Sequence, residues 1–284
     1  MQDRLDPLIA ERAPWLFRED LWTPPARRAL NRMLGYNKTI ALGEVLRELP
    51  SDRIMTEMAK RLAMDVSVSG LANVPSHGPA LIVANHPTGI ADGIIMDAVL
   101  RPFRPDLFFY ANVDILRVLP QMHSMIAPVE WRPEKRTHGK TRETMAYTRQ
   151  AVSEGRLGVI FPSGRLAKRR GLQLHEREWM TSAAMLARKY RLPVIPINIR
   201  ARNSVLFYLF DKIHPTLRDI TLFHETLNKD RQPFRITVGE QISPNALPAK
   251  SDEATEFLKR ATLRLGDAAQ SVSLVRATRR PSWV

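Results

Sequence analysis

The sequence predicts an α/β fold, with a largely parallel central sheet flanked by helices and a helical N-terminal segment before it. Short apolar runs alternate with longer amphipathic runs between residues 66 and 239. Two of the short runs, residues 80–85 and 156–161, are almost entirely apolar, which is typical of strands buried on both faces of a parallel sheet. Polar residues and turn formers follow directly after these runs, where α/β proteins gather their sites.

The first third of the chain is predicted to be helical. Residues 26–34 and 39–49 carry Leu, Met and Ile at helical spacing, and Ser51 begins an amphipathic run that continues to residue 63. We therefore expect residues 1–64 to form a helical segment. Its apolar residues either anchor the protein at a membrane interface or cap the core; they are Trp15, Leu16, Phe17, Leu21 and Trp22.

The rest of the chain is expected to form an α/β domain, residues 65–270, and a basic tail, residues 271–284. Strands are predicted at residues 66–70, 80–85, 106–111, 126–130, 156–161, 193–199 and 234–239. Helices are predicted at residues 90–100, 136–153, 176–190 and 252–269. The tail, with Trp283, is either a solvated terminus or a segment that lies on anionic lipid.

Composition narrows the class of protein. The 284 residues include 43 Lys and Arg against 29 Asp and Glu, a net charge of +14, and no cysteine. The lack of cysteine excludes disulfides, a thiolate nucleophile and Cys-ligated metal sites. The positive charge favours an anionic partner, namely nucleic acid, anionic lipid or an acidic protein. Neither a membrane-spanning apolar run nor a secretion signal is visible, so we expect a soluble or peripheral protein.

A histidine and an aspartate follow the first buried strand. His86 comes directly after residues 80–85, and Asp92 lies in the first turn of the next predicted helix. The carboxylate of Asp92 could accept a hydrogen bond from one imidazole nitrogen while the other nitrogen takes a proton from a hydroxyl. This is a base with its orienting group, without a serine nucleophile. The alternative is that His86 is a capping or core residue and Asp92 a helix N-terminal charge.

A basic turn follows the strand at residues 156–161. Ser163 and Gly164 offer a hydroxyl and backbone N–H groups, and Arg165 adds a guanidinium, a set that suits an anion. The spacing is not that of a Walker loop. The alternative is a solvated basic loop, which is the expected state for some of Lys168, Arg169 and Arg170.

Two further strand ends carry polar residues. Arg202 and Asn203 follow residues 193–199 and are candidates for the rim of the site. Arg132 follows residues 126–130; taken alone, it belongs to a charge run that is typical of a solvated face.

Together these segments resemble the glycerolipid and lysophospholipid acyltransferase family, in order as well as in content. NHPTGIADG, from residue 85, is similar to the family's Asn-His…Asp block, and APVEWR falls where a second block ends in a substrate-facing arginine. FPSGR lies where the family has Phe-Pro-Glu-Gly-Thr-Arg, and LPVIPI matches the last block. The resemblance covers residues 66–204.

The sequence departs from the family pattern at two places. Five residues, rather than the family's four, separate His86 from Asp92; this form resembles the hemolysin-like branch, which includes ornithine-lipid acyltransferases, and Gly89 is expected to absorb the extra residue. Ser163 replaces the family's glutamate, and Arg165 arrives one residue early. This second change favours an acceptor that lacks a phosphate monoester.

The resemblance implies a lyso-lipid O-acyltransferase. His86 would be the general base, oriented by Asp92, and backbone N–H groups near Gly89 would be candidates to stabilise the oxyanion. The substrate-binding residues that it implies are Asn85, Gly89, Arg132, Ser163, Gly164, Arg165, Lys168 and Asn203. The donor would be acyl-CoA or acyl carrier protein, with no metal and no further cofactor.

The acceptor implied by the resemblance is a lyso-aminolipid such as lyso-ornithine lipid, or alternatively 1-acylglycerol-3-phosphate. The protein would lie at the inner face of the cell membrane, on anionic lipid. A different class remains open, in which the protein binds nucleic acid or a membrane without catalysis. Nucleic acid is not the expected partner, because zinc spacing, an RNP-like aromatic pattern and a basic recognition helix are all missing.

Overall fold

The computed structural model of the protein describes residues 1–62, 65–130, 135, 137–229, 232–266 and 271–274. Five helices belong to the N-terminal third: α1 (Gln2–Arg12), the 3-10 helix η1 (Pro14–Phe17), α2 (Thr23–Met33), α3 (Tyr36–Arg47) and α4 (Ser51–Leu62). The helical N-terminal segment is therefore confirmed within the described residues. None of the described helices is long and apolar enough to cross a membrane.

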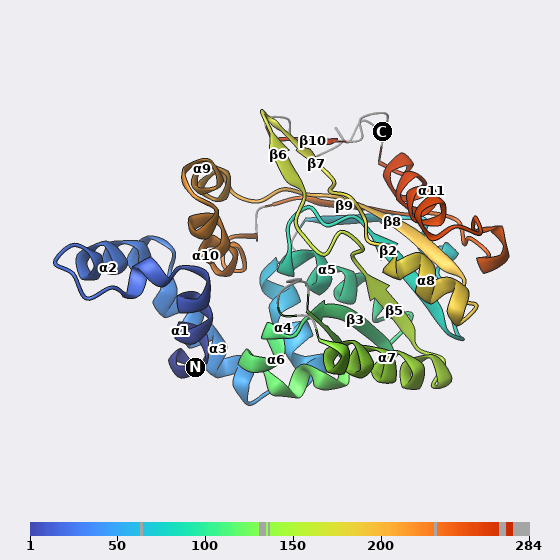
Figure 1. Ribbon diagram of the computed structural model, residues 1–284, viewed down its shortest axis with the longest axis horizontal. Coiled ribbons are helices and arrows are strands. Elements are labelled where there is room, and N and C mark those ends of the chain that lie inside the picture. The colour runs from blue at the N-terminus through green and yellow to red at the C-terminus, as the bar shows by residue number, and fades with distance from the viewer. Residues whose placement is uncertain (63–64, 131–134, 136, 230–231, 267–270, 275–284) are drawn as a thin grey trace.

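The central sheet has seven strands in the order β1-β9-β8-β2-β5-β3-β4. Their bounds are β1 (Val66–Ser69), β2 (Ala80–Ala84), β3 (Leu107–Asn112), β4 (Ile126–Val129), β5 (Leu157–Ile160), β8 (Val194–Arg200) and β9 (Phe234–Val238). Five neighbouring strands from β8 to β4 are parallel; β9 pairs antiparallel with β8 and parallel with β1. The expected largely parallel sheet is confirmed (Figure 1).

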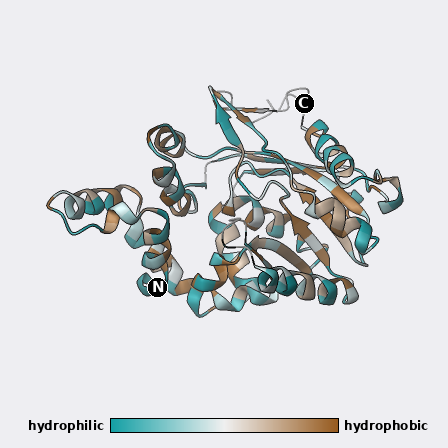
Figure 2. Ribbon diagram, viewed as in Figure 1, coloured by the Kyte–Doolittle hydropathy of each residue, from teal (hydrophilic) through white to brown (hydrophobic). Residues whose placement is uncertain are grey.

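Helices cover both faces of this sheet (Figure 1). The side chains of β2 alternate: Ile82 faces a core built with α3, α4 and α5 (Ile90–Leu100), whereas Leu81 and Val83 face a second core. That second core is built with α7 (His138–Ser153), α8 (Ser182–Lys189) and α11 (Ser251–Arg264). Burial on both faces explains why the strand sequences are apolar without alternation. Figure 2 shows the brown, apolar residues gathered on the strands and on the inner sides of these helices.

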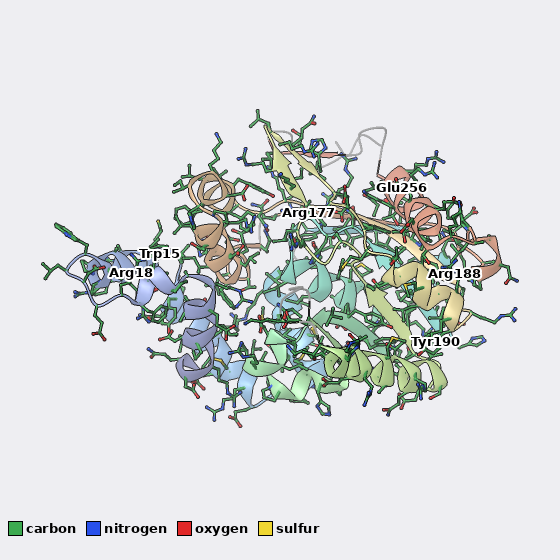
Figure 3. The ribbon with its side chains drawn as sticks, viewed as in Figure 1. Trp15, Arg18, Arg177, Arg188, Tyr190 and Glu256 are labelled. Atoms are coloured by element: carbon green, nitrogen blue, oxygen red, sulfur yellow. The ribbon has the colours of Figure 1, made fainter. Side chains whose placement is uncertain are left out.

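A third, smaller core joins the N-terminal segment to two helices that follow β8, α9 (Val205–Ile213) and α10 (Pro215–Glu225). Leu16 is buried in it against Phe210, and Trp15 donates a hydrogen bond from Nε1 to Thr216 Oγ1 at 2.9 Å (Figure 3). Leu21 and Trp22 instead are 90% and 82% exposed. The two alternatives for these five apolar residues therefore each apply to some of them. Trp15, Leu16 and Phe17 cap this core, whereas Leu21 and Trp22 face solvent.

Two predicted elements differ from the structure. Residues 176–190 were expected to be one helix, but α8 begins only at Ser182, because residues 176–181 take part in buried contacts instead of continuing a helix. The segment at residues 168–170 is not a loop, because it forms β6 (Lys168–Arg170), which pairs with β7 (Gln173–His175). Lys168 and Arg170 are exposed, as expected for some of these three basic residues. The start of the tail, β10 (Ser271–Ser273), pairs with β7, while the remaining tail, with Trp283, lies outside the described residues. The short helix α6 (Asp114–Val118) completes the elements near the site.

Candidate active site

The loop between β2 and α5 is organised around the buried carboxylate of Asp92. Its Oδ2 lies 2.9 Å from His86 Nδ1 and accepts hydrogen bonds from the backbone N–H of Thr88 at 2.9 Å and of Gly89 at 3.0 Å. Its Oδ1 accepts from Thr88 Oγ1 at 2.6 Å. The side chain of Asp92 is 0% exposed, so these donors take the place of water. The longer spacing between His86 and Asp92 therefore still brings the two side chains together.

Gly89 is the residue that makes this spacing work. Its φ of +95° lies in a region that L side chains rarely adopt, and a Cβ there would come within 2.9 Å of Leu166 Cδ2. The backbone N–H groups of Gly89 and Thr88 are both used by Asp92. These two groups are thus not free to stabilise an oxyanion, which corrects the expectation for the N–H groups near Gly89.

The hydrogen bond to Asp92 decides which nitrogen of His86 is available. An ionised carboxylate only accepts hydrogen bonds, so Nδ1 carries the proton and Nε2 keeps its lone pair. Among the described residues Nε2 has no hydrogen-bond partner, and the imidazole, 19% exposed, borders a large cavity. The ring stacks on Phe161, with centroids 4.3 Å apart. Asp92 and Phe161 therefore hold the imidazole in place while the ring remains accessible from the cavity, as a general base requires.

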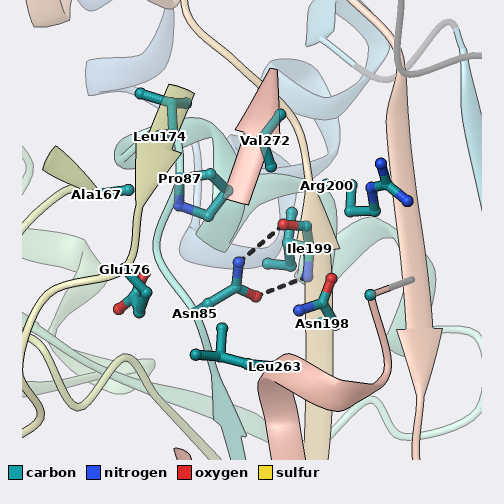
Figure 4. A pocket seen from close by; sticks show the side chains of 11 residues that line it. Asn85, Pro87, Ala167, Leu174, Glu176, Asn198, Ile199, Arg200, Leu263 and Val272 are labelled. Atoms are coloured by element: carbon teal, nitrogen blue, oxygen red, sulfur yellow. Dashed lines mark hydrogen bonds between the residues drawn. The ribbon is translucent and has the colours of Figure 1, made fainter. Parts of the chain in front are cut away.

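Glu176 stabilises the same loop by accepting a hydrogen bond from its backbone. Its Oε2 accepts a hydrogen bond from the backbone N–H of His86 at 3.1 Å, and its Oε1 accepts from Trp179 Nε1 at 3.0 Å. Burial raises the pKa of Glu176, and these two hydrogen bonds oppose the rise. The carboxylate borders a small cavity of about 20 Å³ behind the loop (Figure 4). No local pattern predicted this role, because 90 residues separate Glu176 from His86.

Several predicted substrate-binding residues are occupied by structural contacts. The amide of Asn85 bridges β2 to β8, donating to Ile199 O at 2.9 Å and accepting from Ile199 N at 2.7 Å (Figure 4). Ser163 is buried and donates from Oγ to Arg165 O at 2.8 Å. Asn203 is buried too, and its Oδ1 accepts from Lys229 Nζ at 2.5 Å.

The other predicted residues gather at the cavity. Gly89, Gly164, Arg165 and Lys168 line it together with His86, whereas Arg132 lies outside the described residues. They meet because β2 and β5 are parallel neighbours, so their carboxyl ends lie at one edge of the sheet. Arg202, the second rim candidate, instead donates to Leu274 O.

The cavity, of about 1440 Å³, has two parts of different chemistry. One part is apolar and is enclosed by residues of α1, α3, α4, α5 and α6 together with the sheet; examples are Leu5, Leu42, Met58, Ile94 and Ile115. The other part, beyond His86, is lined by basic side chains, namely Arg165, Lys168, Arg169, Arg177 and Arg218. The imidazole of His86 borders the same cavity. The arrangement suits an amphiphile whose reacting atom lies between an apolar chain and an anionic group.

Comparisons with known proteins agree with this geometry. Residues 65–200 match the family model described as Acyltransferase. Over 184 residues, 62% of the chain, it is 24% identical to the lyso-glycine lipid O-acyltransferase of Phocaeicola vulgatus, and over 183 residues it is 22% identical to that of Bacteroides thetaiotaomicron. These matches span 64% and 65% of the relatives' own lengths. These similarities support an acyltransferase domain of the glycerolipid and lysolipid type over residues 65–200.

A solved structure shows the same fold. The 1-acyl-sn-glycerophosphate acyltransferase PlsC from Thermotoga maritima superimposes with a TM-score of 0.50 over 83% of this chain and 92% of its own, at 16% sequence identity. The likeness covers more of the chain than residues 65–200, so the shared fold is larger than the segment that matches the family model.

Replacing Glu176 tests how far the active-site loop depends on it. Glu176→Ala removes the acceptor of two N–H groups, those of His86 and Trp179, and should lower the free energy of unfolding by about 1–3 kcal/mol. Urea denaturation measures this change. Glu178→Ala is the matched control, because Glu178 is exposed two residues away. Equal stability of the two variants would contradict a supporting role for Glu176.

Proposed function

We propose that the protein transfers a fatty acyl group from an acyl thioester to the hydroxyl of a membrane lyso-lipid, with His86 as general base. The single observation that carries the proposal is the hydrogen bond from His86 Nδ1 to the buried carboxylate of Asp92, while the other face of the imidazole borders the cavity. A base oriented in this way needs no covalent intermediate on the enzyme, in keeping with the absence of cysteine.

The chemistry proceeds through His86 in two proton transfers. Nε2 removes the proton of the acceptor hydroxyl, and the oxygen attacks the carbonyl carbon of the thioester. The tetrahedral intermediate then expels the thiolate as the C–S bond breaks, and the thiolate takes the proton from the imidazolium. Asp92 stabilises the imidazolium between the two transfers. General base catalysis of this kind contributes about 10²–10⁴-fold, and positioning of the two substrates supplies the rest.

For the acceptor we propose a lyso-lipid with an amino-acid headgroup, of the lyso-ornithine or lyso-glycine type. Two relatives are named lyso-glycine lipid O-acyltransferases, and Ser163 stands where the family pattern has glutamate. The alternative acceptor is 1-acylglycerol-3-phosphate, which the name of the PlsC structure states for that protein. As donor we propose acyl-CoA or acyl carrier protein, both acidic and therefore attracted by the net charge of +14. The reaction as proposed requires no metal or further cofactor.

The apolar part of the cavity is proposed to hold an acyl chain. Its lining residues and His86 border one continuous cavity, so a chain placed there could extend from His86 into the apolar part. Burying a chain in this space removes it from water, at about 0.8 kcal/mol for each methylene.

The protein is proposed to work on the inner face of the cell membrane, docked through α9 and the start of α2. Val205, Leu209 and Ile213 recur every four residues along one face of α9 and are exposed. Leu21 and Trp22 are exposed on the N-terminal segment, which shares a core with α9. Arg18, Arg28 and Lys212 are exposed among these apolar residues, so the surface suits an anionic bilayer, where the acceptor resides.

Acyl transfer with variants of the two central residues tests the proposed function. His86→Ala and Asp92→Asn should each lower kcat by about 10²-fold or more, because the first removes the base and the second places an amide where three donors meet. The assay follows a labelled acyl thioester into lyso-ornithine lipid, a lyso-glycine lipid and lysophosphatidate. Transfer that survives His86→Ala would refute this mechanism.

A substitution inside the cavity tests the acyl-chain site. Gly93 lies in α5 and lines the cavity, and a Cβ there would meet nothing within 4 Å. Gly93→Leu should therefore fold, with helix stability raised by up to about 1 kcal/mol, yet lower kcat/KM for long chains about tenfold or more. Short-chain substrates should be affected less. The control is Gly93→Ala, which should leave chain preference unchanged; the same preference in Gly93→Leu would place the chain elsewhere.

Co-sedimentation tests the docking surface. Leu209→Glu should reduce binding to vesicles containing phosphatidylglycerol about tenfold, because it replaces a membrane-facing apolar side chain by an acidic one. Phe103→Glu is the control, since Phe103 is also exposed but follows the far end of α5. Equal loss in both variants would contradict docking through α9. Stronger binding to DNA than to vesicles in the wild type would favour the nucleic-acid alternative.

A further inference from the structure

Arg177 lines the basic part of the cavity, and its side chain forms no ion pair with any described residue. Arg177 follows Glu176 directly, is half-buried, and donates from Nε to Leu166 O at 2.8 Å. Its two Nη atoms have neither a hydrogen bond nor an ion pair with any described residue. In Figure 3, Arg177 lies between the α9–α10 pair and the central part of the molecule.

Two neighbouring arginines, Arg218 and Arg169, are paired with carboxylates, unlike the Nη atoms of Arg177. Arg218 on α10 pairs with Asp219 at 2.7 Å and with Asp211 at 3.2 Å. Arg169 on β6 approaches the other oxygen of Asp211 at 3.5 Å. The two acidic side chains are therefore already occupied by Arg218 and Arg169.

The surroundings of Arg177 favour an anion beside it. Burial lowers its pKa, the nearby positive charges of Arg218 and Arg165 lower it further, and the carboxylates of Asp211 and Glu176 oppose this shift without contacting the Nη atoms. A half-buried guanidinium among like charges is costly unless a negative group completes it. Because all three arginines line the cavity, a bound ligand can supply that group.

The backbone holds Arg177 close to the reacting atoms. The residue before it, Glu176, accepts the N–H of His86. The residue after Leu166, Ala167, donates its N–H to His86 O at 2.9 Å. Arg177 is thus connected to the His86 loop through Glu176 and through Leu166, and it lines the same cavity as His86, so an anion bound beside it lies in the cavity that holds the reacting groups.

We infer that Arg177, flanked by Arg165 and Arg218, binds the carboxylate of an amino-acid headgroup on the acceptor lipid and so selects N-acyl amino acids over neutral lyso-lipids. This inference rests on the proposed function. One guanidinium without a counter-charge matches the single charge of a carboxylate, whereas a phosphate monoester carries about −1.5 to −2 at pH 7. The planar Nη pair also fits the two oxygens of a carboxylate in a bidentate arrangement.

The test compares an N-(3-hydroxyacyl)glycine with its neutral glycinamide as acceptors, in the wild type and in Arg177→Met. Methionine keeps an apolar stem but no charge. The wild type should prefer the acid over the amide in kcat/KM by about 10- to 100-fold, the value of a charged hydrogen bond. Arg177→Met should lose this preference while its rate with the amide stays close to that of the wild type. Arg260→Met, an exposed arginine on α11, is the control and should keep the preference.

Three results would overturn the inference. An unchanged preference in Arg177→Met would show that Arg177 does not read the carboxylate, and an equal fall with acid and amide would show a structural role alone. A loss confined to lysophosphatidate would assign the site to a phosphate. A raised KM for acyl-CoA, with acyl-pantetheine unaffected, would assign Arg177 to the donor.

Binding measured without turnover separates this inference from the proposed function. On the His86→Ala background, calorimetry should show tighter binding of the acid than of the amide, and the difference should vanish in His86→Ala with Arg177→Met. If the wild type acylates none of the acceptors but this difference is present, the proposed function fails and the carboxylate site stands. If acylation occurs and the difference is absent, the carboxylate site fails alone.

Discussion

The carboxylate of Asp92 is the interaction on which the rest of the site depends. It gathers donors from His86, Thr88 and Gly89 in a place that water does not reach. One buried charge thereby closes the turn from β2 to α5, caps the first turn of the helix, and fixes the tautomer of the imidazole. The same bonds that hold the loop together also orient the imidazole that we propose as the general base.

The sheet supplies the framework that makes this loop rigid. β2 lies between β8 and β5, and the amide of Asn85 joins it to β8 just before the catalytic loop. From the other side, Glu176 holds the backbone of His86, and Phe161 at the end of β5 supports the ring. The Asn85 bridge to β8, the Phe161 ring after β5 and the Glu176 carboxylate together keep the imidazole in a defined position.

Two separate parts of the chain line the cavity. Helices of the N-terminal third enclose its apolar part, while the β6–β7 hairpin, the loop after it and α10 border its basic part. The proposed amphiphilic substrate would contact both groups of residues and the imidazole, which border one cavity. The N-terminal helices therefore form part of the cavity wall. An ion pair of 2.7 Å between Arg12 on α1 and Asp114 on α6 fixes them to the α/β domain.

The sequence by itself determined the class of fold, the central strands and the pairing of His86 with Asp92, because these depend on apolar runs and on spacing within a few residues. Only the tertiary structure decided that Glu176 and Arg177 belong to the site, since both were expected inside a helix and come from a loop far along the chain. It also decided that Asn85, Ser163 and Asn203 are occupied by internal hydrogen bonds, which no pattern of residue types reveals. Local spacing reflects helix and strand geometry, whereas the partners of a buried polar group are set by which distant segments pack against it.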